Sequence, residues 1–157
     1  MNTLIKSTLA LLVLSSAALA EGEHQHAKAI PGPKGARVVE VVGGYAEFFV
    51  LPDRKVSVTF YGEDMKPLPP AEQVVSVVAE APTGKAKLEF EKTGEGFVSK
   101  AALPQGDGYR IVLQIKPDAT GKTQNFRIDF HLEQCGECKL AEYACTCAGS
   151  TGDGHAH

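Results

Sequence analysis

The sequence is poor in several features that mark particular classes of protein. It has no tryptophan, two methionines and no cysteine before residue 135. After residue 20, no apolar run approaches the roughly 20 residues that a membrane-spanning helix needs. No segment has the apolar period of an amphipathic helix, and no complete phosphate-binding loop, serine-hydrolase elbow or zinc-protease motif is present. These absences argue against a helical protein, and we expect no enzyme activity.

Residues 1–20 have the pattern of an export signal. Lys6 provides the early positive charge, residues 7–18 are apolar and nearly uncharged, and Ala18 and Ala20 are the small residues that a signal peptidase reads. We expect cleavage before Glu21 and a periplasmic or secreted protein without a membrane span. The mature chain would carry 15 basic and 19 acidic residues, a net charge of −4, which argues against nucleic acid as a partner.

From residue 37 onward, apolar and polar residues alternate with a period of two, interrupted by glycine and proline. This pattern predicts an all-β fold, a single antiparallel immunoglobulin-like β-sandwich of about seven to eight strands with a Cys-rich C-terminal hairpin. The expected strands are residues 38–42, 45–50, 54–61, 73–79, 87–91, 97–100, 109–115 and 126–132.

The inward-facing residues of these strands predict a core that can fold without cross-links, since each fully buried side chain contributes roughly 1.5 to 3 kcal/mol. The predicted core comprises Val56, Val58, Phe60, Val75, Val77, Leu88, Phe90, Ile111, Leu113, Ile115, Phe126, Ile128 and Phe130. The predicted organisation is a signal peptide (1–20), a flexible His-containing lead (21–36), the sandwich (37–133), a Cys-rich segment (134–147) and a flexible Gly- and His-containing tail (148–157).

All four cysteines fall in one short segment near the C-terminus. Cys135 and Cys138 form a Cys-x-x-Cys motif, and Cys145 and Cys147 form Cys-x-Cys. The first motif can place two sulfurs on one side of a turn, and the second places two on one face of an extended strand. Four thiolates match the coordination number of Zn²⁺, and thiolates also suit Cu⁺. The segment therefore predicts a metal site for Zn²⁺ or Cu⁺.

Two disulfides are the alternative interpretation of these cysteines, because exported proteins meet an oxidising environment. Cys138 would pair with Cys145 inside a bond between Cys135 and Cys147, or the bonds would be staggered. The chain would then be a cell-envelope interaction module with a stapled hairpin. A thioredoxin-like role is disfavoured, since the first motif does not open a helix that would lower a thiol pKa.

Histidines are weaker candidates for auxiliary metal ligands. His24 and His26 lie near the mature N-terminus, and His155 and His157 end the chain. Neutral imidazoles at these positions could assist in capturing a metal ion. His131 lies four residues before the first cysteine, but strand alternation predicts that it points to solvent.

The export signal, the single sandwich and the His-x-His motif of His24 and His26 resemble small exported β-sandwich proteins that handle copper or other heavy metals beside efflux and resistance systems. Those proteins typically use methionine and histidine ligands, whereas the mature chain here has Met65 as its one methionine. The resemblance implies metal handling with a cell-envelope partner such as an efflux component. We therefore predict an exported, non-enzymatic metal-binding protein that is accessory to metal efflux or homeostasis.

Overall fold

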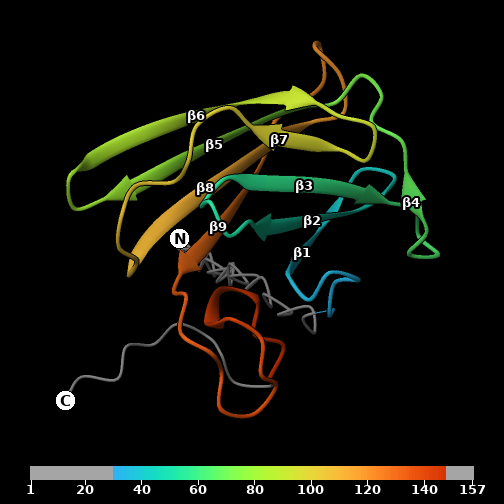
Figure 1. Cartoon of the computed structure of the whole chain (residues 1–157). Helices are drawn as coiled ribbons and strands as arrows, with labels where there is room; N and C mark the ends of the chain where they lie inside the picture. The colour runs from blue at the N-terminus through green and yellow to red at the C-terminus, as the bar shows by residue number, and fades with distance from the viewer. Residues whose placement is uncertain (1–29, 148–157) are drawn as a thin grey trace, which may run out of the picture.

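The computed structural model describes residues 30–147, which form short strands and one 3-10 turn (Figure 1). Within this range no helix is long and apolar enough to cross a membrane. The elements are β1 (Arg37–Val41), β2 (Gly44–Val50), β3 (Val56–Tyr61), β4 (Pro67–Leu68), β5 (Val74–Ala81), β6 (Gly84–Lys92), β7 (Phe97–Ser99), β8 (Tyr109–Lys116), β9 (Gln124–Phe130) and the turn η1 (Glu142–Ala144). The predicted all-β fold is confirmed.

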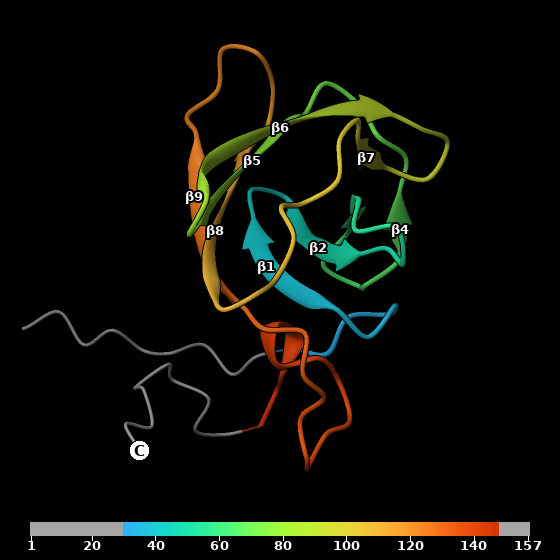
Figure 2. The same ribbon diagram turned by 60° about the vertical axis from the view of Figure 1, so that its left-hand side comes forward.

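The strands pair antiparallel in the order β1-β2-β3-β7-β6-β5-β8-β9, with β4 beside β3. β6 connects the two halves, because its first residues pair with β5 and its last residues pair with β7. The sheet curls strongly, so that β1 and β2 face β5 and β8 across a common interior (Figures 1 and 2). At the open side, the Val42 amide donates to the Gln124 side-chain oxygen at 3.1 Å. This is a sandwich-like antiparallel fold, as predicted, with the two layers continuous through β6.

Period-two alternation fills the interior. In β8, for example, Ile111, Leu113 and Ile115 are buried, while the residues between them are more exposed. The predicted core residues are all buried except Phe90 and Phe126, which are partly buried and pack against the core. The sandwich thus has a continuous hydrophobic core of its own, which holds the strands in place.

β3 differs from the other strands because all six of its residues are buried. Its inward residues belong to the core, whereas Ser57, Thr59 and Tyr61 point to the outer face of the sheet. Residues 31–36, which the sequence assigns to the flexible lead, lie over this outer face and contact it: the Lys34 ammonium donates to the Thr59 hydroxyl at 3.0 Å. The outer face of β3 is therefore a partly covered surface.

A fully buried carboxylate holds residues 31–36 in place. One oxygen of Glu47 accepts the amides of Lys34 and Ala36 at 2.9 and 3.1 Å, and the other accepts the Tyr61 hydroxyl at 2.7 Å. Burial and this bond to Glu47 raise the pKa of Tyr61. The chain passes so close that a Cβ on Gly32 would lie 2.1 Å from the carboxylate, so only glycine fits there. These hydrogen bonds offset the cost of burying the carboxyl group.

Candidate metal centre

After β9 the chain forms a small hairpin that carries the first cysteine pair. Gln134 and Ala141 pair as an isolated antiparallel bridge. Inside it, the Cys135 amide donates to the Leu140 carbonyl at 2.8 Å, and the Lys139 amide donates back to the Cys135 carbonyl at 3.1 Å. Lys139 has a φ of 63°, the left-handed conformation that reverses the chain. The Cys-x-x-Cys motif therefore lies on a tight turn closed by backbone hydrogen bonds.

The second cysteine pair is positioned by η1, whose central residue is an anchor in the core. The Tyr143 ring lies edge-on to Phe48, with centroids 6.0 Å apart, and 5.8 Å from the Phe130 ring. Its hydroxyl accepts the Val50 amide at 3.2 Å, and burial raises its pKa. Cys145 follows two residues later, so the core of the sandwich determines where the second thiol pair starts.

Backbone hydrogen bonds also connect this segment to the residues that follow β9. The Glu142 amide donates to the Glu133 carbonyl at 2.8 Å, and the Tyr143 amide donates to the His131 carbonyl at 3.2 Å. In Figure 1 the segment lies at one end of the sandwich, below β9 and β1. The thiols are consequently held against the folded domain by side-chain packing and by the main chain.

The two motifs bring their four sulfur atoms together. The Cys135–Cys145, Cys138–Cys145 and Cys135–Cys147 sulfurs are 3.4, 3.7 and 3.8 Å apart, and all four lie within 4.8 Å of one another. In a tetrahedron with zinc–sulfur bonds of about 2.3 Å, the sulfurs are about 3.8 Å apart. Cys135 and Cys145 are buried, while the other two are half-buried. The cluster thus has the dimensions of a site for one ion.

No disulfide joins the four cysteines in this structure. A disulfide requires sulfurs about 2.05 Å apart, much closer than any pair here, so the disulfide alternative finds no support in the geometry. Four thiolates at these separations would repel one another strongly unless protons or a cation compensated their charge. The cluster is therefore compatible with metal binding.

The local environment differs among the thiols. The amides of Leu140 and Thr146 donate to the sulfur of Cys138 and lower the pKa of that thiol to about 6. The pKa of Cys147 is raised, first by its hydrogen bond with Cys145 and then by burial. The surroundings therefore favour the thiolate form at Cys138 more than at Cys147. Amide donors to thiolate sulfur are a favourable feature, because they stabilise the charged form that a metal needs.

The histidines do not take part in this group within the described residues. His131 is exposed, as strand alternation predicted, and the group that could hold an ion consists of the four cysteines alone. The other four candidates, His24, His26, His155 and His157, lie outside the described residues. Their proposed role as auxiliary ligands stays a prediction.

Sequence reasoning missed the residue that anchors the site. Tyr143 lies between the two cysteine motifs in a short link with no apolar period, so no pattern marked it as a core residue. One feature of the sequence could have identified it: Tyr143 is the one aromatic residue in the segment from Cys135 to Cys147. A single aromatic side chain in a short thiol-bearing link is a reasonable candidate for docking against the neighbouring domain.

The chain matches no protein-family model, no curated protein and no solved structure. The resemblance to exported copper-handling sandwiches accordingly stays a prediction. What the thiol cluster does must be inferred from its own residues and their geometry.

Proposed function

We propose that this chain is an exported, non-enzymatic metal-binding protein that holds one ion through Cys135, Cys138, Cys145 and Cys147. The observation that carries the proposal is the convergence of four cysteine sulfurs within 4.8 Å of one another. They come from two motifs that are fixed independently, one by a hairpin and one by η1. Such convergence matters because a ligand set that is already assembled loses little conformational entropy when the ion binds.

Zn²⁺ is the ion that these sulfurs suit best, with Cu⁺ as the alternative. Tetrahedral sites of four sulfurs are typical of zinc, and the observed separations are close to those of a zinc tetrathiolate. Four protein ligands would complete the coordination shell and leave no position for a substrate or a reactive water. A closed shell of this kind supports a binding role and not a catalytic one.

Export and a role beside metal efflux or homeostasis belong to the same proposal. They rest on the charge and apolar pattern of residues 1–20, which is typical of a signal peptide. The partner would be a component of the cell envelope that supplies or receives the ion. Expression of the full chain followed by N-terminal sequencing of the exported protein tests this part: a start at Glu21 supports it, and retention of residues 1–20 contradicts it.

The metal itself is tested by native mass spectrometry of the purified, exported protein together with elemental analysis. We expect about one equivalent of Zn²⁺, and four thiols that resist alkylation until a chelator is added. Substituting Co²⁺ for Zn²⁺ should produce the absorption bands of a tetrahedral thiolate complex. Competition between Zn²⁺ and Cu⁺ for the apo-protein then identifies the preferred ion.

Two variants make this experiment specific. The variant with all four cysteines changed to serine should bind no Zn²⁺, whereas the matched control His131→Ala should keep the full equivalent, since His131 lies outside the thiol group. An intact mass about four hydrogens below that of the reduced chain, with no metal bound, would favour two disulfides and an interaction module instead.

A further inference from the structure

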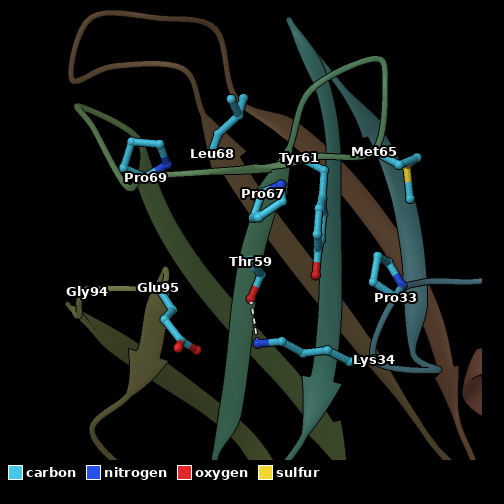
Figure 3. Close-up of a pocket in the computed structure, with 10 residues that line it drawn as sticks. All are labelled: Pro33, Lys34, Thr59, Tyr61, Met65, Pro67, Leu68, Pro69, Gly94 and Glu95. Atoms are coloured by element: carbon cyan, nitrogen blue, oxygen red, sulfur yellow. Dashed lines mark hydrogen bonds between the residues drawn. The ribbon is translucent and has the colours of Figure 1, made fainter.

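A groove of about 530 Å³ opens on the outer face of β3 (Figure 3). β4 and the proline-rich residues after it form one wall, and the loop at residues 33–34 forms another. The turn before β7 closes a third side, and Thr59 and Tyr61 form the floor. The groove has the volume of many ligand sites and shares no residue with the thiol cluster. It is therefore a second feature of the molecule that metal binding does not explain.

Most of the lining of the groove is apolar. It includes Pro33, Met65, Pro67, Leu68 and Pro69, and the side chain of Leu68 is 41% exposed although it is a large aliphatic group. Prolines have no amide hydrogen to donate to another strand. The wall that contains Pro67 and Pro69 is therefore unsuited to strand addition, in which a ligand extends the sheet. The wall instead offers rigid apolar surfaces against which side chains of a ligand can pack.

Two opposite charges project into the groove from facing walls. The Lys34 ammonium donates to the Thr59 hydroxyl at 3.0 Å, which leaves two of its three hydrogens for a ligand. The Glu95 carboxylate comes from the opposite wall, as Figure 3 shows, and forms no hydrogen bond or ion pair within residues 30–147. The two groups do not pair with each other across the groove. A ligand can satisfy both charges only if it carries a negative and a positive group.

β3 is also incompletely covered along the edge that faces this groove. β7 pairs with Ser57 and Val58 there, and β4 pairs with Phe60 and Tyr61. Thr59 lies between these two short pairings and has its strand partner on the other edge, in β2. The groove thus lies along β3 at an interruption in the pairing of that edge, and a ligand that followed the strand there would be an extended chain.

We propose that this groove binds an extended peptide segment of a partner protein. Apolar side chains of the segment, proline or leucine for example, pack on the proline, methionine and leucine wall. An acidic side chain meets Lys34 and a basic side chain meets Glu95, so that charge complementarity fixes the direction of the segment. The partner is identified by this pattern of an acidic and a basic residue that flank a short apolar stretch.

Peptide titrations followed by backbone NMR of the full mature protein test the proposal. The probes are two blocked tetrapeptides of opposite direction, Ac-Glu-Leu-Pro-Lys-NH₂ and Ac-Lys-Leu-Pro-Glu-NH₂, and a charge-free analogue, Ac-Gln-Leu-Pro-Gln-NH₂. We expect one direction to shift the amides of Thr59, Tyr61 and Glu95 with saturation, and to bind about threefold to tenfold more tightly than the charge-free peptide. Equal binding of all three peptides would mean that the groove is merely an apolar site, and would overturn the proposal.

Variants locate the contact. Lys34→Gln and Glu95→Gln should each weaken the preferred peptide about threefold, and Leu68→Asp should weaken it about tenfold. The matched control is Lys87→Gln with Glu89→Gln, a pair in a separate hollow of about 440 Å³ on another part of the sheet, which should leave binding unchanged. An absence of saturable shifts at millimolar peptide, or equal losses in the control pair, would refute the site. Either result would leave the zinc measurement unaffected.

Discussion

The strands and the Cys-rich segment bury very different shares of their residues. In β5 and β8 every second residue is buried, whereas between residues 131 and 147 burial is confined to Cys135, Tyr143, Ala144 and Cys145. The strands are stabilised by a shared apolar core, which scales with buried area. The Cys-rich segment has one aromatic anchor and a few main-chain hydrogen bonds. An ion that bridged the four sulfurs would add cross-links to this segment, whose own contacts are few.

This contrast shows how a thiol cluster is attached to a domain that has a hydrophobic core of its own. The sandwich provides a rigid surface, and Tyr143 fixes the segment to that surface at one point. The sulfurs on either side of the anchor are then within reach of one ion. The local stability of the segment should therefore respond to metal, while that of the strands should not.

The largest expected effect tests the anchor itself. Tyr143→Ala should lower the free energy of unfolding by about 3 kcal/mol, because it leaves a cavity beside Phe48 and Phe130 and an unsatisfied Val50 amide. Tyr143→Phe keeps the ring and should cost about 1 kcal/mol. Urea denaturation of the metal-loaded proteins measures both values. A cost near zero for the alanine variant would mean that η1 is not anchored in the core.

The predicted strand pattern succeeded because alternation follows directly from burial of one face of a sheet. Val56, Val58 and Phe60 are inward in the structure for the reason that made them stand out in the sequence. The thiol cluster was also predictable, since close spacing of cysteines limits where their sulfurs can lie. The sequence thus indicated that the four sulfurs lie together, but it did not indicate which residue holds them against the sandwich.

The contacts that escaped prediction join segments with no periodicity. Glu47 lies in a strand whose pattern gives no sign that its outward side chain is fully buried, because the donors come from the loop at residues 31–36. Tyr143 likewise enters the core from an irregular link. In both cases a long-range contact decides the position of an irregular segment, and local propensity carries no information about such a contact.

Removal of metal is the next test of the contrast between the two regions. After chelation, the amides of Cys135 and Lys139, which are hydrogen-bonded inside the hairpin, should exchange with deuterium at least about tenfold faster. Amides of the central strands β5 and β8 should change by less than about threefold. The variant with four serines should behave like the chelated protein in a hydrogen-exchange experiment. If the central strands lose their protection as well, the sandwich depends on the metal and the proposed division between the two regions is wrong.

The smallest expected effect concerns the turn of the hairpin. Lys139 adopts a left-handed φ of 63°, which is unfavourable for any residue with a side chain, and Met65 in the sandwich has a similar φ of 57°. Lys139→Gly should stabilise the hairpin by about 0.5 to 1 kcal/mol. Deuterium exchange of the hairpin amides should become slower, while exchange of the β5 and β8 amides should not change. Met65→Gly is the matched control, because it relieves a similar strain away from the thiols and should leave hairpin exchange unchanged. If both variants slowed deuterium exchange of the hairpin amides equally, the hairpin and the sandwich would unfold as one cooperative unit. The Cys-rich segment would then have no local stability of its own.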